Sequence, residues 1–238
     1  QFTAVPSAQM ISLAEDNYAQ VLRENELSGN QQYNDQVKRV GHRISSAVEE
    51  YFRDQGRQEV LKNYQWEFHV LKSEEKNAWC MPGGKIAFYE GILPICKDDN
   101  GVAVVMAHEI AHAVARHGNE RLSQQLAIQL GGMVLSEALE KEEEKTRQLA
   151  MAAFGVGSQL GILLPYSRTH EKEADELGLY FMAMANYDPR GAPDFWKRMQ
   201  AEAGSGPPEF LSTHPNPETR IKNMEENMQE ALKYYEGK

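Results

Sequence analysis

The spacing of apolar residues along the first part of the chain predicts two helices followed by strands. Apolar positions recur at helical intervals over residues 7–29 and 33–54, and a Ser-Gly-Asn segment separates the two. Apolar and polar residues alternate over 65–71, which predicts a strand. Residues 77–90 predict a hairpin, because two short apolar runs flank a Pro-Gly-Gly turn.

A longer apolar segment follows the hairpin. Apolar residues lie on every side of the helix predicted over 101–117, so this helix is expected to be buried in the core. The residues just before it are good helix caps and suit the positive end of the helix dipole; they are Asp98, Asp99 and Asn100.

The rest of the chain is predicted to be helical. Apolar stretches over 120–139 and 149–164 are separated by the charged residues 140–147, which predicts a helical hairpin with a polar tip. This hairpin is either a lid or a membrane-facing surface, or it is ordinary helical packing with a solvated loop. Residues 189–203 and 217–235 complete the helices, and each of them begins with a proline that follows a capping residue.

These elements predict an α+β, mainly α fold with a small β-sheet or hairpin beside the buried helix. One domain is expected over residues 1–238. Its expected parts are N-terminal helices (1–55), strand, hairpin and buried helix (65–117), helical hairpin (118–165) and C-terminal helices (166–238).

The buried helix carries an H-E-x-x-H sequence formed by His108, Glu109 and His112. Residues four apart lie on one face of a helix, so the two imidazoles can bind one metal ion. Glu109 is then placed to take the proton from an attacking water molecule. The alternative is a pair of core histidines bonded to backbone groups. We disfavour it, because a buried apolar helix carries such residues on one face only if something satisfies them.

A catalytic zinc site needs a third protein ligand, and residues 167–178 contain the best candidate. Ser167 is placed to cap a helix on which Glu171 and Asp175 share a face. Glu171 can bind the metal. Asp175 can accept a hydrogen bond from the free ring nitrogen of a ligand histidine, for which we favour His108.

Other residues of this segment compete for the role. Acidic runs usually form a solvated helix face, and we expect Glu173 and Glu176 to do so. His170 is a competing ligand, but it lies next to Glu171 in sequence and so points to a different face.

Four segments occur in the same order as in a known family. They are residues 77–86, the sequence at 108–112, residues 167–175, and Thr213-His214-Pro215 with Arg220 and Ile221. With them the chain resembles the M48 family of zinc metallopeptidases. It departs from the family pattern in having Trp79 for phenylalanine and Cys80 for a small residue.

The resemblance implies a gluzincin-like helical domain, one Zn²⁺ per chain, Glu171 as the third ligand and Asp175 beside the ligands. It also implies that His214 and Arg220 lie near the zinc and act in catalysis. His214 would contact the metal region or the oxyanion, and Arg220 would orient carboxylates or bind the intermediate. The alternatives are a simple His-Pro turn and an Arg220 ion pair at the surface.

The first arm of the hairpin is the predicted substrate edge. In zinc peptidases of this kind, a strand beside the metal helix holds an extended peptide by strand addition. The alternative is a hairpin that only packs on that helix. The residues of the edge are Asn77, Ala78, Trp79, Cys80 and Met81.

Composition limits the partners and the site type. The net charge of −10 argues against nucleic acid or an anionic membrane as the main partner. No C-x-x-C is present, which excludes a thiolate zinc ribbon. Cys80 and Cys96 are expected to be buried free thiols; a disulfide is the alternative if the compartment is oxidising.

The same observations suggest a location. No segment has the run of about 18 apolar residues that a spanning helix needs. The chain therefore resembles the soluble periplasmic BepA-type members more than the membrane-spanning Ste24 and HtpX types. Because it begins at Gln1, we expect a processed form in the periplasm or another extracytoplasmic compartment, with a membrane anchor removed. Peripheral membrane contact through 120–164 is a further expectation.

The predicted function is that of a zinc-dependent endopeptidase acting on protein or peptide substrates, in envelope protein quality control. The alternative is a chaperone or assembly factor for envelope proteins with a closed or weakly active zinc site.

Overall fold

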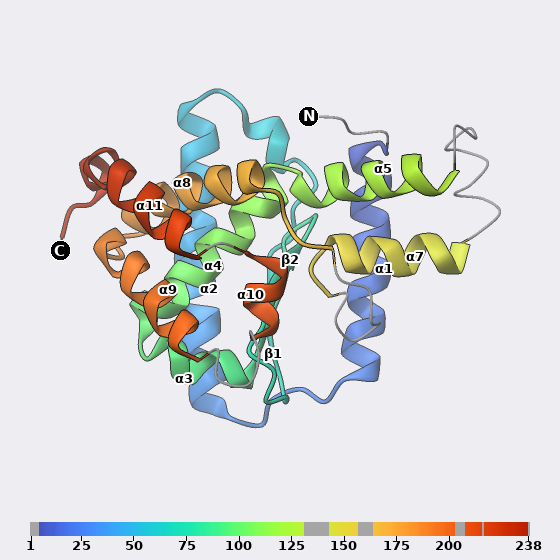
Figure 1. Cartoon of the computed structure of the whole chain (residues 1–238), viewed down its shortest axis with the longest axis horizontal. Helices are drawn as coiled ribbons and strands as arrows, with labels where there is room; N and C mark the ends of the chain where they lie inside the picture. The colour runs from blue at the N-terminus through green and yellow to red at the C-terminus, as the bar shows by residue number, and fades with distance from the viewer. Residues whose placement is uncertain (1–4, 131–142, 157–163, 203–207, 216, 238) are drawn as a thin grey trace.

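A computed structural model describes residues 5–130, 143–156, 164–202, 208–215 and 217–237. Over these ranges the protein is mainly helical with a small three-stranded sheet, which confirms the predicted α+β, mainly α class. Figure 1 shows the arrangement of the helices around the sheet. None of the helices described there is both long and apolar enough to cross a membrane.

The elements have the following bounds. The helices are α1 (Ser7–Glu24), α2 (Gln31–Asp54), α3 (Leu93–Cys96), α4 (Asp99–Val114), α5 (His117–Leu130), α7 (Glu143–Ala153), α8 (Arg168–Met184), α9 (Ala192–Ala201), α10 (Glu209–Thr213) and α11 (Pro217–Ala231). The strands are β1 (Glu67–Leu71), β2 (Ala78–Met81) and β3 (Lys85–Tyr89).

The predicted strand and hairpin are confirmed. The sheet has the order β1-β3-β2, with β3 parallel to β1 and antiparallel to β2. Gly83 and Gly84 form the hairpin turn with φ of 87° and 82°, a left-handed backbone that glycine adopts without a steric penalty. Because the strand order is β1-β3-β2, strand β2 lies at one edge of the sheet.

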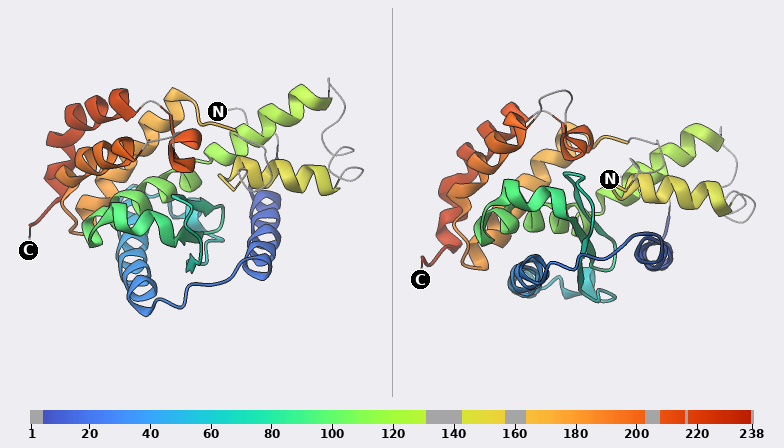
Figure 2. Two further views of the ribbon diagram at one scale, coloured as in Figure 1. Left: turned by 60° about the horizontal axis from the view of Figure 1, so that its bottom comes forward. Right: turned by 90° about the horizontal axis from the view of Figure 1, so that it is seen from below.

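Alternate side chains of the sheet enter two hydrophobic clusters. Phe68 and Ile86 point to one face and pack in a cluster with α2, α4 and α8. Leu71 and Tyr89 point to the other face, in a cluster with α1, α5 and α7. The two views of Figure 2 show the sheet between these groups of helices.

Helix α4 lies in the larger cluster, and every residue from Gly101 to Val114 is buried. Asp98 caps the helix, because its side chain accepts a hydrogen bond from the N–H of Gly101 at 2.9 Å. Helix α8 packs directly on α4 at Gly178. A Cβ at this position would come within 3.3 Å of the backbone nitrogen of His108, so glycine permits the close approach of the two helices.

The first or last residues of three predicted helices are wrong. The helix predicted over 7–29 ends at Glu24, because the residues that follow pair with β1; the N–H of Ser28 donates to Val70 O at 2.8 Å. The helix predicted over 101–117 ends at Val114, and a new helix begins at His117. The break between them is at Arg116, whose φ of 62° is left-handed.

The third boundary concerns the helical hairpin. Residues 143–147 of the charged segment belong to α7, and α7 ends at Ala153 instead of continuing to 164. Helices α5 and α7 lie side by side, α7 also packs on α1, and the far ends of α5 and α7 extend beyond the other helices (Figures 1 and 2). Residues 131–142 and 157–163 lie outside the described residues, so the lid and membrane roles of this hairpin stay predictions.

Candidate metal centre

Four buried side chains converge at the contact between α4, α8 and the segment after α10. His108, His112, Glu171 and His214 each place one ligand atom within 4.8 Å of the others. The first two come from successive turns of α4. Glu171 lies in the first turn of α8, which begins where Ser167 accepts a hydrogen bond from the N–H of His170 at 3.2 Å. The structure thus brings all three predicted ligands together and adds His214.

The distances between these ligand atoms suit a metal ion with tetrahedral coordination. A zinc ion bound at about 2.0–2.1 Å holds its ligand atoms roughly 3.3 Å apart. His112 Nε2 lies 3.0 Å from His108 Nε2 and 3.4 Å from Glu171 Oε1. His214 Nδ1 lies 3.2 Å from His108 Nε2 and 3.0 Å from Glu171 Oε1. Nitrogen and carboxylate donors at these distances fit a metal ion such as zinc.

Two of the ligands are held in the protonation state that binds metals. Burial lowers the pKa of His112 well below its usual value, so its ring is neutral. Burial alone would raise the pKa of Glu171, but the charge of Arg220, with a further contribution from the neighbouring His214, holds it well below its usual range. The carboxylate is therefore ionised.

His108 differs from the other ligands. Burial and Arg220 lower its pKa, but hydrogen bonds with Asp175 and Glu171 outweigh both and raise it to about 9. A cation bound at this ring must therefore displace a proton.

Glu109 lies beside the ligand cluster. Its Oε1 atom is 3.3 Å from His214 Nε2 and makes no hydrogen bond, although the side chain is buried. Burial raises the pKa of Glu109 to about 8, which makes the carboxylate a stronger proton acceptor than an exposed glutamate.

Arg220 joins the two acidic residues of α8. Its Nε donates to Asp175 Oδ2 at 2.8 Å, and its Nη1 lies 2.8 Å from Glu171 Oε2. Asp175 Oδ1 in turn lies 3.0 Å from His108 Nδ1. The guanidinium packs on the ring of Trp196, 3.5 Å from its centre, and is almost fully buried. A surface ion pair, the alternative considered for Arg220, is therefore excluded.

The predicted substrate edge lies next to this centre but is covered. Residues 77–81 are almost fully buried, with Trp79 in the same cluster as Phe154. The N–H of Phe210, in α10, donates to the carbonyl of Lys76 just before β2 at 3.2 Å. Cys80 and Cys96 are both free and buried.

Sequence patterns missed four residues that pack around the site. The ring of Tyr166 stacks on His112 at 3.8 Å, and Arg121 covers the other face of Tyr166 at 3.7 Å. These contacts join segments far apart in the chain, so no local spacing pointed to them. The four missed residues are His117, Arg121, Tyr166 and Trp196.

Comparisons with known proteins place the chain in a family. The sequence profile of "Peptidase family M48" matches residues 37–228. The chain is 38% identical over 173 residues to "Mitochondrial metalloendopeptidase OMA1" of Schizosaccharomyces pombe, covering 72% of this chain and 49% of that protein. It is 31% identical over 183 residues to "Metalloendopeptidase OMA1, mitochondrial" of Homo sapiens, covering 74% and 35%.

A bacterial relative is also similar. The chain is 28% identical over 159 residues to "Beta-barrel assembly-enhancing protease" of Escherichia coli (strain K12), covering 65% of this chain and 32% of that protein. The chain thus spans about half or less of these relatives, with 49%, 35% and 32% covered. The profile match over most of the chain confirms the resemblance seen in the sequence, and the chain belongs to peptidase family M48.

Proposed function

We propose that this chain is a zinc-dependent endopeptidase that hydrolyses peptide bonds of protein substrates. One observation carries the proposal: ligand atoms of His108, His112 and Glu171 converge in a buried site, and Glu109 lies directly beside them. Family membership supports it. A purely structural site would leave the buried carboxylate of Glu109, whose Oε1 makes no hydrogen bond, without a task.

The residues divide the work as follows. When bound, zinc polarises the scissile carbonyl and lowers the pKa of water to about 7. Glu109 accepts the proton of the attacking water and later gives it to the leaving amine. Asp175 accepts the Nδ1 proton of His108 and so holds that ring with Nε2 toward the ligand cluster. Arg220 fixes both carboxylates of α8.

Chelation and reconstitution test this function. The purified chain should cleave an unfolded substrate such as casein, lose that activity in a chelator, and regain it when one equivalent of zinc is restored. Cleavage that survives removal of all metal would overturn the proposal. Binding of casein or of an unfolded β-barrel protein without cleavage would favour the alternative function, an assembly factor.

That alternative is supported by the position of His214. Its Nδ1 atom lies in the ligand cluster and its Nε2 lies 3.3 Å from Glu109, so the side chain is placed to take the fourth position of a bound ion. A fourth protein ligand closes a zinc site. We therefore propose that the resting site is blocked, which suits a protein whose peptidase activity is low until a substrate engages it.

Replacing His214 with alanine separates its two proposed roles. A blocking ligand predicts that His214→Ala raises casein hydrolysis by the zinc-loaded enzyme several-fold, because the fourth position opens. An oxyanion donor predicts a loss of about 100-fold or more in kcat. We expect the increase. A loss of kcat with zinc still bound would contradict the blocked site and support the oxyanion role.

The substrate is proposed to be an extended segment of protein added to the edge of β2. The N–H of Tyr89 donates to Asn77 O, so the backbone of the next residue, Ala78, faces away from β3. In the resting structure the Ala78 N–H donates to Asn77 Oδ1 at 2.9 Å, so a substrate carbonyl has to replace that acceptor. Ala78→Pro removes the N–H and should raise KM about tenfold, whereas Ala78→Gly, which keeps the N–H, should not. Equal KM values for the two variants would refute the substrate edge.

The cellular setting is also a proposal. The name of the bacterial relative refers to β-barrel assembly, and those of the eukaryotic relatives to mitochondria. We propose that this chain acts in an extracytoplasmic compartment, in quality control of envelope proteins. Fractionation of cells expressing the full-length protein tests this; recovery only in the cytoplasm would contradict it.

A further inference from the structure

His117 lies behind the ligand His112, on the side away from the metal cluster. The two Nδ1 atoms are 2.9 Å apart. On a continuous helix, residues five apart point about 140° away from one another. Here α4 ends at Val114, and the left-handed Arg116 turns the chain so that the first residue of α5 faces back toward α4.

The contacts continue from His117 to the surface of α8. Its Nε2 lies 3.1 Å from Glu173 Oε2. His117 is fully buried, whereas the side chain of Glu173 is about half exposed at 48%. The three side chains therefore form one line from the ligand cluster to solvent, in the order His112, His117, Glu173.

The order of these three side chains determines which ring nitrogen of His112 and of His117 carries the proton. His112 presents Nε2 to the cluster, so as a neutral ligand it carries its proton on Nδ1. That proton can be donated only to an acceptor, which makes His117 Nδ1 the acceptor. The proton of His117 is then on Nε2, where it is donated to Glu173.

We propose that His117 is a positioning residue of the metal site, which fixes the tautomer and ring orientation of His112 and is itself oriented by Glu173. It accepts a hydrogen bond from Nδ1 of His112, as Asp175 does from Nδ1 of His108. The inference rests on the proposed function, because it assumes that His112 binds the metal. It assigns a task to a buried residue that the mechanism above does not use.

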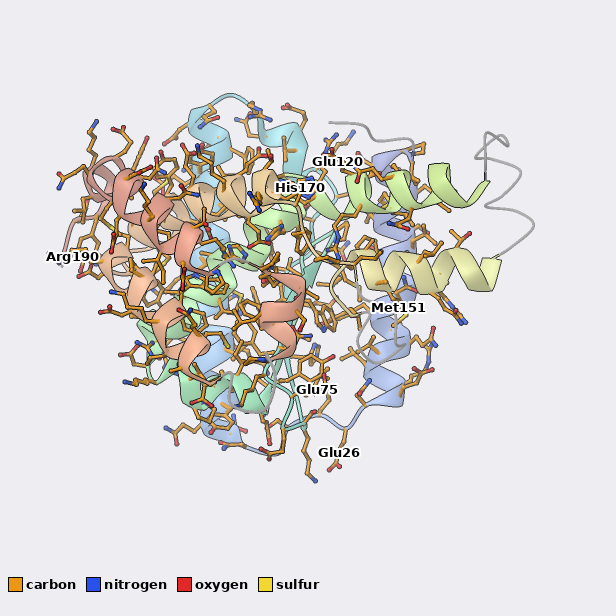
Figure 3. The ribbon with its side chains drawn as sticks, in the orientation of Figure 1. Glu26, Glu75, Glu120, Met151, His170 and Arg190 are labelled. Carbon is orange, nitrogen blue, oxygen red and sulfur yellow. The ribbon has the colours of Figure 1, made fainter. Side chains whose placement is uncertain are left out.

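A second histidine–carboxylate pair joins the same two helices and provides a control. His170 Nε2, on α8, lies 3.3 Å from Glu120 Oε2, on α5, and Figure 3 shows these two side chains pointing toward one another. The rings of His170 and His117 stack with their centres 4.5 Å apart. This pair links α5 to α8 as the His117–Glu173 pair does, but its imidazole is directed at Glu120 and not at a ligand.

Zinc affinity of three variants of the full chain tests the proposal. His117→Leu removes the acceptor and should weaken zinc binding, measured by chelator competition, by about 10–100-fold. His117→Asn places an amide oxygen near the Nδ1 position and should restore most of that affinity. Glu120→Gln breaks the control pair and should leave zinc affinity within about threefold of wild type.

Cobalt substitution gives a measurement of the metal's surroundings that a loss of protein stability alone does not change. The visible absorption of the Co²⁺ form should change in His117→Leu and return toward wild type in His117→Asn. If His117→Leu does not fold, Glu173→Ala at its half-exposed position should still weaken zinc binding in the same direction.

The outcomes are distinct. Wild-type affinity in His117→Leu, or no recovery in His117→Asn, would overturn the inference. An equal loss in Glu120→Gln would show that both pairs merely hold α5 on α8 and would overturn it too. A wild-type chain that binds no zinc would instead overturn the proposed function.

Discussion

Replacing Glu109 with glutamine is expected to lower kcat for peptide hydrolysis by about 1,000-fold while the zinc content stays at one per chain. Glutamine has nearly the same size and shape, so the packing around this buried side chain is kept. It cannot accept a proton from water, and that is the task proposed for Glu109. Initial rates on casein and metal analysis of the same sample check both halves of the expectation.

A matched acid on α8 provides the control. Glu176 accepts a hydrogen bond from Tyr180 and lies away from the ligand cluster, so Glu176→Gln should keep wild-type turnover. A Glu109→Gln variant that retains a tenth or more of the wild-type kcat would contradict the general-base role. Loss of zinc from this variant would contradict the view that Glu109 is not a ligand.

Replacing Arg220 with alanine is expected to destabilise the metal-free protein by about 3–5 kcal/mol, because it leaves buried carboxylates without their counter-charge. Arg220 contacts both Asp175 and Glu171, and its guanidinium covers Trp196. In the zinc-loaded variant kcat should also fall, because both carboxylates lose their fixed orientation. Urea unfolding in the presence of a chelator measures the first effect, and casein hydrolysis with saturating zinc measures the second.

Arg220→Lys is the informative comparison. Lysine keeps the charge but lacks the planar fork that reaches two carboxylates at once, so its effects should be intermediate. Unchanged turnover in Arg220→Ala with zinc bound would refute a role for this residue in catalysis. An unfolding free energy within about 1 kcal/mol of wild type would contradict the contacts described here.

The sequence was most informative where helical periodicity decides which residues share a face. The spacing of His108 and His112, and that of Glu171 and Asp175, is enough to place each pair on one side of a helix. The structure then brings the two helices together at Gly178. The strand and the hairpin were predictable for a similar reason, since alternation and a glycine turn specify them, but the parallel pairing of β1 with β3 was not.

Helix ends were harder to predict. Arg116 has a left-handed backbone that usually calls for glycine or asparagine, so nothing in the sequence indicated a break before His117. The sequence predicts a polar tip that includes the charged residues 143–147. Glutamate, lysine and arginine are good helix formers, however, and here they begin α7.

Sequence patterns could not predict the residues that support the site through tertiary contacts. Tyr166 meets His112 only because α8 returns to α4, and Trp196 meets Arg220 only because α9 lies beside α11. His214 was expected near the metal, but only the folded chain places its Nδ1 among the ligand atoms.

The central claim is that this site binds zinc through imidazole and carboxylate ligands. X-ray absorption of the purified chain, with metal analysis, tests it most directly. We predict one zinc per chain, bound only by nitrogen and oxygen atoms at about 2.0–2.2 Å, and loss of that zinc in Glu171→Ala. A chain without stoichiometric zinc after reconstitution, sulfur at about 2.3 Å in the coordination shell, or full zinc content in Glu171→Ala would contradict the account.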